Sequence, residues 1–470
     1  MPGGIYGTGG RHETYPGGFM NIVIVGCGKV GMVITQQLSS EDHNITLVDE
    51  DSEAIAAVTN HYDAMGVVGN GVSYQTLVEA GISDCDLFIA VTDSDEKNLL
   101  ACLIAGKAGK CKTIARVRNP IYSHEIDFLK REFNLAMVIN PEDAAAMEIS
   151  RVFLFPSAFK IDTFSGGRIE LFHFHVTEGM PVCGQSLMAL REDMLKGIIV
   201  CTIKRGNEVI IPKGNFSFAA EDNVSIAATR KDALAFFRKL GEVKGRVKNA
   251  MIVGGGTMSY YLAERLLRSG IDTTIVEMDY KRCEELSSKL PAARILHGDG
   301  TNRDLLDQED ISTFQGFAAL TGLDEENILL SLYARKHSSA KVVTKIGRLN
   351  FGSVIDALNL DTIINPQKIT ADYIVKFARS MSADASDDVE SLYKLENGKA
   401  EALEFKIKVE SPVTGVKLRD LKLKKNALVC SIFRNGKNII PTGQDELMVG
   451  DSVIVVIGGA HIANIREILE

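Results

Sequence analysis

The chain has 470 residues, of which 45% are apolar and 24% charged, a composition typical of a globular protein with about three or four domains. Its formal net charge of -9, without a basic tract, argues against nucleic acid as a partner, since a nucleic-acid-binding protein needs a basic face. The eight cysteines stand singly, which argues against disulfides and a metal site, and no apolar run approaches the ~18 residues of a membrane span.

The folded part of the chain is expected to begin near Met20. Residues 1–19 are rich in glycine and show no periodicity, which predicts a disordered extension, with Met20 as the natural start. No signal peptide is visible in this stretch.

A glycine motif follows directly. An apolar strand over residues 22–25 leads into Gly26-x-Gly28-x-x-Gly31 and a helical pattern. Gly26 permits the tight turn, Gly28 lets a phosphate approach bare backbone, and Gly31 lets the helix pack close to the sheet. The helix N-terminus offers free N–H groups and a partial positive charge to that phosphate. The plain alternative is a turn that only packs.

A carboxylate stands where such a site needs one. A second strand over residues 45–48 ends on Asp49, about where an acid accepts hydrogen bonds from both ribose hydroxyls. This favours NAD or an adenosine ribose over NADP, whose 2′-phosphate the carboxylate would repel. Strand, glycine loop, helix and acid together predict a nucleotide site.

Strands and helices then alternate as far as Asn140-Pro141, which predicts a parallel, doubly wound sheet. Ser94 is the expected N-cap of one of the helices, because two acids follow it in the first turn. The expected strands are residues 64–68, 87–91, 112–117 and 136–139, and the expected helices include residues 53–60 and 98–108.

The whole pattern occurs twice in the chain. Gly26 and Gly254 are separated by 228 residues, as are Asp49 and Glu277. A spacing of 229 residues separates the further pairs Gly71 and Gly300, Asn98 and Asn327, and Arg116 and Lys345. Such constant spacing indicates a duplicated sequence.

The segments after each nucleotide fold are duplicated as well. Residues 158–235 and 396–470 hold short alternating strands typical of small α+β modules, with no catalytic constellation, and we expect them to serve association or regulation. Linkers are expected near residues 241–248 and 380–390. The predicted fold class is α/β, with two tandem Rossmann-like doubly wound domains, each followed by a small α+β domain. The expected boundaries are 20–155, 156–240, 248–380 and 390–470.

The helix expected over residues 144–155 is apolar nearly all round. One face of a single domain cannot bury such a helix. It either crosses between domains and packs on a neighbour, which we favour, or lies inside a large core.

These motifs resemble the TrkA-type potassium-uptake regulators, whose subunits carry two RCK nucleotide-binding domains, each followed by a TrkA-C domain. The resemblance covers residues 20–470 and is carried by the two glycine turns, the Gly-Asn-Gly and Gly-Asp-Gly segments, the paired Asn98 and Asn327, and the Ile-Asn-Pro strand ends. It implies a ring, expected to be a homotetramer, that binds NAD(H) or ATP and ADP. It further implies a cytoplasmic protein, peripheral on the cell membrane, that gates a TrkH/TrkG-like potassium transporter and has no catalytic residues.

The two halves are expected to differ in their sites. Lys29 would place a cation beside a phosphate, unless it is only a solvated surface residue, whereas the second loop has Thr257 there. Ser259 replaces the third glycine, and Asn70 stands where the second half has Asp299. The predicted nucleotide-binding residues are Gly26, Cys27, Gly28, Lys29, Val30, Gly31, Asp49, Asn70, Thr92, Asn98, Arg116, Gly254, Gly256, Thr257, Met258, Glu277, Asp299, Thr321 and Lys345.

The functional alternatives are an NAD-dependent oxidoreductase and an inert scaffold. Hydride transfer needs a positioned acid or base and a substrate pocket beside the nicotinamide. The sequence offers no separate substrate domain, and His173 and His175, two residues apart on one expected strand, are better explained as structural residues. A ligand-gated regulator explains the duplicated architecture better.

Overall fold

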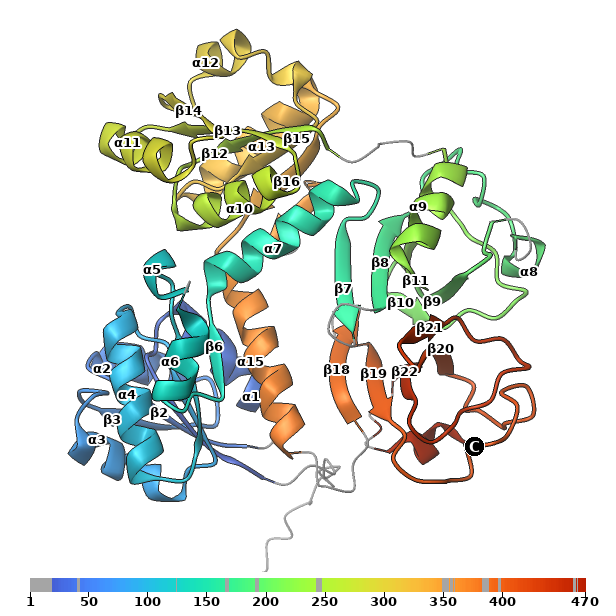
Figure 1. Ribbon diagram of the computed structural model, residues 1–470, viewed down its shortest axis with the longest axis horizontal. Helices are drawn as coiled ribbons and strands as arrows, with labels where there is room; N and C mark the ends of the chain where they lie inside the picture. Colours follow the sequence, from blue (N-terminus) through green and yellow to red (C-terminus); the bar gives the residue numbers. More distant parts are fainter. Residues whose placement is uncertain are drawn as a thin grey trace, which may run out of the picture.

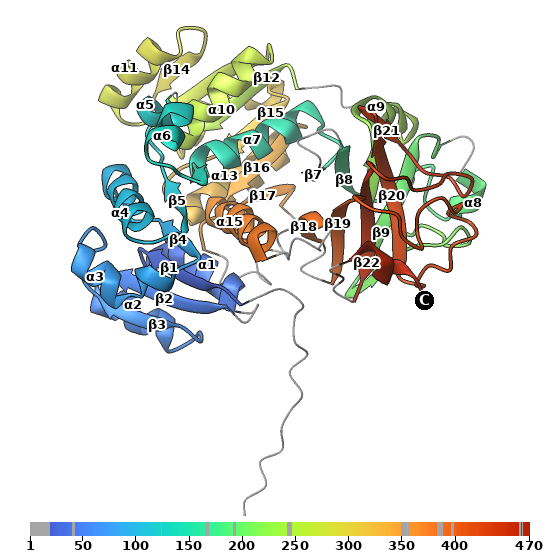
Figure 2. The same cartoon turned by 60° about the horizontal axis from the view of Figure 1, so that its bottom comes forward.

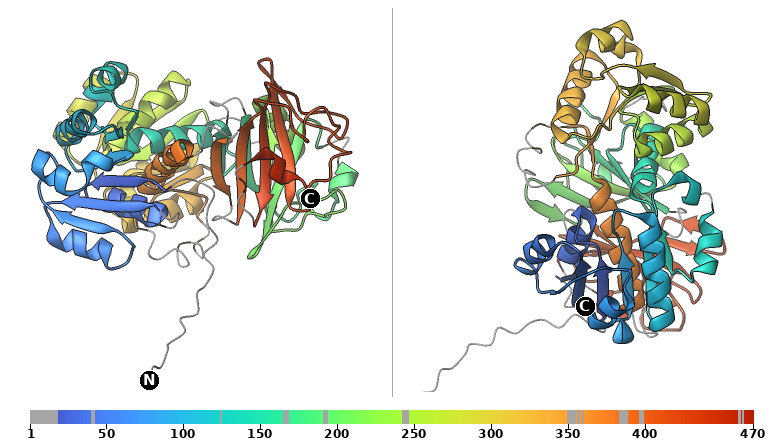
Figure 3. Two further views of the ribbon diagram at one scale, coloured as in Figure 1. Left: turned by 90° about the horizontal axis from the view of Figure 1, so that it is seen from below. Right: turned by 90° about the vertical axis from the view of Figure 1, so that its left-hand side faces the viewer.

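The structure is a computed structural model, which describes residues 19–39, 43–123, 125–164, 169–190, 194–241, 247–348, 360–382, 389–395, 399–459 and 464–470, with the single residues 355, 358 and 462. The predicted extension over residues 1–19 therefore lies outside the described residues, apart from residue 19. Two units built on parallel sheets lie at one end of the molecule and two antiparallel sheets at the other (Figure 1, Figure 3).

The first half begins with a six-stranded parallel sheet in the order β3-β2-β1-β4-β5-β6, which confirms the predicted doubly wound fold. The order reverses between β1 and β4, and ligands of such sheets bind at this switch point. Its strands are β1 (Asn21–Val25), β2 (Asn44–Asp49), β3 (Met65–Val68), β4 (Leu87–Ala90), β5 (Lys112–Arg116) and β6 (Met137–Ile139). Its helices are α1 (Lys29–Ser39), α2 (Ser52–Thr59), α3 (Tyr74–Glu79), α4 (Asp95–Ala108), α5 (Pro120–Ser123) and α6 (Ile126–Glu132).

The second half repeats this sheet in the order β14-β13-β12-β15-β16-β17. Its strands are β12 (Asn249–Val253), β13 (Asp272–Glu277), β14 (Arg294–His297), β15 (Gly316–Ala319), β16 (Lys341–Lys345) and β17 (Thr362–Ile364). Its helices are α10 (Thr257–Arg268), α11 (Tyr280–Lys289), α12 (Arg303–Gln308) and α13 (Asp324–His337).

The N-cap predicted at Ser94 in the first half is confirmed, because its hydroxyl accepts the N–H of Lys97 at the start of α4.

The small domains contain antiparallel sheets in the orders β10-β9-β11-β8-β7 and β18-β19-β22-β20-β21. The strands of the first are β7 (Lys160–Phe164), β8 (Ile169–His175), β9 (Ile198–Arg205), β10 (Glu208–Ile210) and β11 (Asn223–Ala228), with helices α8 (Leu187–Leu190) and α9 (Arg230–Lys239). The strands of the second are β18 (Val389–Leu395), β19 (Ala400–Lys406), β20 (Ala427–Arg434), β21 (Lys437–Ile439) and β22 (Ser452–Gly458).

One ion pair with a buried carboxylate recurs in both small domains. The carboxylate of Asp222 is fully buried and accepts hydrogen bonds from Arg205 Nε at 2.8 Å and Nη2 at 2.7 Å. Asp451 and Arg434 repeat the pair at 2.7 Å for both bonds. A buried carboxylate needs such partners, so these repeated acids serve the fold.

Each parallel sheet is covered by a helix from the other half of the chain. The helix α7 (Pro141–Leu154) follows the last strand of the first parallel sheet, yet its Ala145 and Ile149 lie in one core with Leu262 and Leu266 of α10. The prediction of a crossing helix is confirmed. Figure 1 and Figure 2 show α7 and the helix α15 (Pro366–Ser382) side by side between the two parallel-sheet units.

Helix α15 makes the reciprocal contact with the first half. Its residues Ile374, Val375 and Ala378 are buried in one core with Ile24 of β1 and Ile34 of α1. Polar contacts fix both crossings: Arg265 Nη2 of α10 lies 2.6 Å from Asp143 Oδ1 of α7, and Gln37 Nε2 of α1 donates to Asp372 Oδ1 of α15 at 2.9 Å. Neither parallel-sheet core is therefore complete without the other half.

Buried asparagines join the strand ends that carry the predicted sites. Asn98 is fully buried; its Oδ1 accepts the N–H of Thr92 at 2.8 Å, and its Nδ2 donates to the carbonyl of Arg116 at 2.9 Å. Asn327 makes the same two bonds in the second half, to Thr321 and Lys345. These side chains hold the ends of neighbouring strands in register.

Because α15 completes the core of the first parallel-sheet unit, we expect a substitution in α15 to destabilise the first sheet. Ile374→Ala should cost roughly 2–5 kcal/mol of unfolding free energy, because it leaves a cavity in a packed core. Hydrogen exchange of the full chain should then speed up in α1 and β1. The control is Leu234→Ala, which removes an isomeric side chain that is 41% exposed on α9. If hydrogen exchange in α1 and β1 stays unchanged in Ile374→Ala, α15 does not stabilise the first sheet.

The buried hydrogen bonds of Asn98 and Asn327 predict a loss of unfolding free energy when these side chains are replaced. Asn98→Leu keeps the number and branching of the side-chain heavy atoms but leaves the N–H of Thr92 and the carbonyl of Arg116 unpaired, each at roughly 1–3 kcal/mol. Chemical denaturation should show a fall in stability of that order for this variant and for Asn327→Leu. Asn207→Leu, in the exposed turn between β9 and β10, is the control and should change stability little.

Candidate functional site

The first glycine loop has the geometry that the motif predicts. Gly26 has a φ of +107°, and a Cβ there would lie 2.9 Å from the backbone of Val91 and Thr92. A Cβ on Gly31 would lie 2.0 Å from the carbonyl oxygen of Gly26, so the helix α1 packs against the loop only with glycine there. Nothing lies within 4 Å of a Cβ built on Gly28, which leaves the backbone open to a ligand.

Asp49 closes the other side of this loop from the end of β2. Its Oδ2 accepts the N–H of Cys27 at 2.6 Å, and its Oδ1 accepts the N–H of Asp51 at 3.0 Å. A carboxylate has about four lone-pair positions, so both oxygens can still accept ribose hydroxyls. The thiol of Cys27 is buried, and this burial together with Asp49 and Asp51 raises its pKa to about 12, so it stays neutral.

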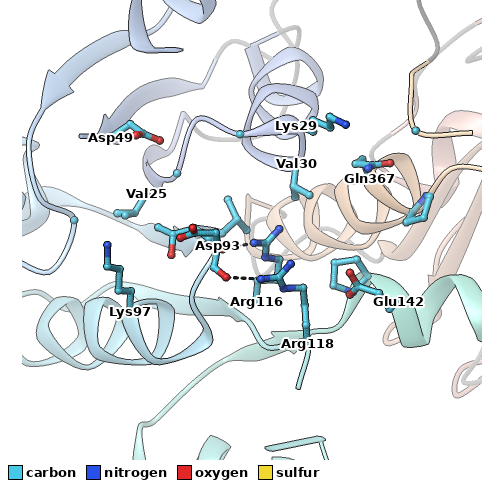
Figure 4. Close-up of a pocket in the computed structure, with 18 of the residues that line it drawn as sticks. Val25, Lys29, Val30, Asp49, Asp93, Lys97, Arg116, Arg118, Glu142 and Gln367 are labelled. Carbon is cyan, nitrogen blue, oxygen red and sulfur yellow. Dashed lines mark hydrogen bonds between the residues drawn. The ribbon is translucent and has the colours of Figure 1, made fainter. Parts of the chain in front are cut away.

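A cavity of about 770 Å³ extends from this loop to the second half of the chain (Figure 4). Both glycine loops and the ends of central strands from both parallel sheets line it. The polar and charged lining side chains are Lys29, Asp49, Glu50, Asp51, Asn70, Thr92, Asp93, Lys97, Arg116, Arg118, Glu142, Thr257, Lys345 and Gln367.

The cavity lies where equivalent positions of the two halves meet. Gly28 and Gly256, which repeat one another at a spacing of 228 residues, both line it, as do Arg116 and Lys345. Glu142 and Gln367, each directly after an Asn-Pro pair, also both line it. The duplication therefore produces a shared cavity between the halves.

Charges are distributed unevenly along this cavity. Asp49, Glu50 and Asp51 follow one another at the end of β2. The half-buried cations Arg116 and Lys345 come from the ends of β5 and β16, and Glu142 contributes to the electrostatic environment of both. The ends of a nucleotide differ in the same way, since the ribose donates hydrogen bonds and the phosphates are anionic.

Three polar atoms in this cavity are buried without a hydrogen-bond partner among the described residues: Arg116 Nε, Glu142 Oε2 and Gln367 Oε1. Figure 4 shows these three side chains around the same space. Burial lowers the pKa of Arg116, with Arg118 as the second cause, and raises that of Glu142. Burial also lowers the pKa of Lys345. Buried polar atoms are normally paired, so these indicate a place for a polar, charged ligand.

The second glycine loop has the same backbone but different contacts. Glu277 Oε2 accepts the N–H of Gly255 at 2.6 Å, as Asp49 does in the first half. Ser259 is fully buried, and its hydroxyl donates to the carbonyl of Gly254. Because a side chain fits there, α10 does not approach its loop as closely as α1 approaches the first.

An arginine further distinguishes the second loop. Arg282 stands where the first half has Ala54, counting from the two acids, and its Nε donates to the carbonyl of Gly255 at 2.8 Å. Its Nη1 lies 2.7 Å from Glu285 Oε2. The second loop is therefore covered by a side chain from α11 that the first loop lacks, a difference that the glycine motif alone does not reveal.

Most of the predicted site residues line the shared cavity, but not all. Those that line it are Gly26, Gly28, Lys29, Val30, Asp49, Asn70, Thr92, Arg116, Gly256, Thr257, Met258 and Lys345. Those outside the lining are Cys27, Gly31, Asn98, Gly254, Glu277, Asp299 and Thr321. Asn98 does not line the cavity; its amide is hydrogen-bonded to the backbone of Thr92 and Arg116, which do line it.

Sequence reasoning missed Arg118, Glu142 and Gln367. Arg118 follows β5, and its backbone N–H donates to Asp95 Oδ2 at 2.9 Å. Glu142 and Gln367 occupy the first turns of α7 and α15, which only the crossing of these helices brings to the cavity. The available signal was their shared place after the repeated Asn-Pro pairs.

The described part of the chain offers neither a membrane-spanning helix nor a cluster of metal ligands. No helix there combines the length and apolarity that a bilayer span requires. No group of three or more His, Cys, Asp or Glu side chains there has an arrangement suited to a metal ion.

Comparison with known proteins places both halves in known families. The TrkA-N domain model matches residues 22–141 and 250–366, and the TrkA-C domain model matches residues 171–241 and 402–470. The Trk system potassium uptake protein TrkA of Halomonas elongata is 32% identical over 460 residues, which cover 96% of this chain and 99% of that protein. The protein of the same name from Haemophilus influenzae is 30% identical over 456 residues, covering 96% and 98%.

Solved structures share the fold. The GsuK channel matches with a TM-score of 0.63 and 16% identity, covering 96% of this chain and 79% of that one. The GsuK RCK domain matches with a TM-score of 0.62 and 17% identity, covering 96% and 95%. With matched TrkA-N and TrkA-C domains over most of its length, the chain belongs to the family of Trk system potassium uptake proteins TrkA.

Proposed function

We propose that this chain is the nucleotide-binding regulatory subunit of a Trk-type potassium uptake system. The observation that carries the proposal is the cavity shared by both halves, with a nucleotide-type glycine loop and Asp49 at one end and buried, unpaired polar atoms at the other. Relatives that match nearly the full chain are named Trk system potassium uptake proteins, which supports the same system for this chain.

The ligand class follows from the residues of the first site. Asp49 would accept the hydroxyls of an adenosine ribose, and the open backbone at Gly28 with the N-terminus of α1 would receive a phosphate. NAD(H), ATP and ADP all contain this adenosine diphosphate unit. A GsuK channel with the same fold is described as bound to NAD, which supports the class without selecting a member.

The shared cavity gives a physical route from ligand to shape. Phosphates bound beside Lys29 would lie near Lys345 and Gln367, which come from the second half. A ligand whose phosphates reach them would favour one arrangement of the halves over another. Differential affinity of typically ~1–3 kcal/mol is enough to shift such an equilibrium.

The partners belong to the same proposal. The chain would assemble into a homo-oligomer, with a tetrameric ring as the expected form, and dock on the cytoplasmic face of a TrkH/TrkG-like potassium transporter. Duplicated domains suit such assembly, because pseudo-symmetric pairs can close into a ring. Light scattering of the purified chain and its co-purification with the membrane subunit test this part.

An NAD-dependent oxidoreductase is the alternative. The described residues that line the cavity include acids, three lysines and two arginines but no histidine, and the second parallel-sheet unit forms part of the lining. Turnover of NADH with added carbonyl substrates would favour the enzyme.

The first site predicts a charge-dependent affinity. Asp49→Asn should weaken NADH, NAD⁺, ATP and ADP binding about 10- to 100-fold, since hydrogen bonds to a charged group contribute roughly 1.5–3 kcal/mol. Calorimetric titration measures this. Glu53→Gln, which removes an exposed charge of α2 outside the cavity lining, is the control and should bind within about threefold of the native chain, as a screened outer charge contributes little. Equal binding by the native and Asp49→Asn chains would contradict the assignment.

The contribution of the second half predicts a dependence on ligand charge. Lys345→Met should weaken ATP binding by about tenfold, since a charge-assisted bond contributes roughly 1.5–3 kcal/mol, and NAD⁺ binding less, since NAD⁺ carries fewer phosphate charges. Lys336→Met, which removes an exposed charge from α13, is the control. If Lys345→Met binds ATP as tightly as the control, ligands do not reach the second half.

A further inference from the structure

The two small domains meet face to face around a pair of cysteines. Leu171 and Ala227 of the first sheet lie in one core with Ala402 and Val456 of the second. Figure 3 shows the two antiparallel sheets packed against each other. Cys201 of β9 and Cys430 of β20 belong to this core, and they occupy equivalent places in the two halves, 229 residues apart.

Each cysteine is the extra residue of a β-bulge. Along the pairing of β9 with β11, Thr202 faces Ser225 and Val200 faces Ile226, which leaves Cys201 between two paired positions. Along the pairing of β20 with β22, Val429 and Ser431 are paired and Cys430 is left between them. A bulge re-aims a side chain, so both sheets carry the same device at the same place.

The bulges bring the two thiols into contact. The Sγ atoms of Cys201 and Cys430 lie 3.2 Å apart, and both residues are fully buried. Each Sγ also lies 3.6 Å from a carbonyl oxygen of its own strand, of Ile199 and Leu428 respectively. A disulfide needs an S–S distance of about 2.05 Å, so about 1 Å of approach separates this pair from bonding.

We propose that Cys201 and Cys430 form a redox pair, whose oxidation links the two small domains covalently across their interface. The proposal rests on the facing bulges and does not depend on the nucleotide site. The two sheets belong to different halves of the chain, so the bond would fix the small domains against each other.

The oxidant would be a small uncharged peroxide, since larger reagents do not enter a closed core. One thiol ionises and its thiolate attacks a peroxide oxygen; the O–O bond breaks, a sulfenic acid forms, and the departing hydroxide takes up the thiol proton as water. The second thiol ionises and its thiolate attacks the sulfenic sulfur; the S–S bond forms, the S–O bond breaks, and the departing hydroxide takes up the second thiol proton as water. The two thiols lose two electrons, and the peroxide gains them.

Burial makes this reaction slow in the closed protein. It raises the pKa of the Cys430 thiol well above the usual value, which keeps the thiol protonated. A thiolate is the reactive form, so exposed cysteines oxidise faster. Any opening of the interface would expose the pair, and closing would bring the sulfurs back into contact.

A second pair of cysteines must be separated from this one in the test. Cys85 and Cys111 of the first parallel-sheet unit share a hydrogen bond, and Cys111 is partly exposed. The Cys111→Ser chain therefore provides the background, since it cannot form that link.

The experiment treats the full chain, native and Cys111→Ser, with hydrogen peroxide and then alkylates it under denaturing conditions. We expect loss of two free thiols in the Cys111→Ser chain, a peptide that joins Cys201 to Cys430 by mass spectrometry, and a higher melting temperature that dithiothreitol reverses. Cys283→Ser in the same background is the control: it removes a thiol of α11, in the second parallel-sheet unit, and should leave the link between Cys201 and Cys430 intact. Cys201→Ala and Cys430→Ala should each abolish it.

Peptide mapping of the native chain needs no substitution, so it tests the proposal even if a cysteine variant fails to fold. The proposal is overturned if peroxide leaves both thiols of the folded chain free, or if the only links found involve other cysteines.

Discussion

The packing of α7 and α15 is the constraint on which the rest of the structure depends. The helices of its own half cover one apolar face of each parallel sheet only in part, and α7 or α15 from the other half completes that core. Ile149 therefore belongs to the core of the second unit and Ile374 to that of the first. The two parallel-sheet units cannot part without exposing apolar side chains of both cores.

The same crossing builds the cavity. The first turns of α7 and α15 bring Glu142 and Gln367 to the point where β5 and β16 deliver Arg116 and Lys345. Arg116, Glu142 and Gln367 each keep a buried polar atom without a hydrogen-bond partner among the described residues, and a charged ligand would supply one. The helices that complete the two cores thus begin beside the residues that would bind a ligand, so the same crossing of α7 and α15 stabilises the fold and forms the cavity.

Local chemistry was predictable from the sequence, whereas contacts between the halves were not. The roles of Gly26 and Gly31 and the cap at Ser94 depend on a few neighbouring residues, and the structure has each as expected. The apolar surface of α7 predicted a crossing, but its partner α10 lies more than a hundred residues away and no local pattern specifies it. Glu142 and the facing bulges at Cys201 and Cys430 depend on such pairings, and the sequence therefore did not reveal them.

The central claim is that a nucleotide in the shared cavity changes how the chain acts on a potassium transporter. The direct measurement is potassium flux into vesicles that contain the membrane subunit of the same system with this chain bound, as NADH, NAD⁺, ATP and ADP are titrated in turn. The account predicts that at least two of these ligands set different flux levels. Flux that is the same at saturation with all four ligands as without any would contradict it.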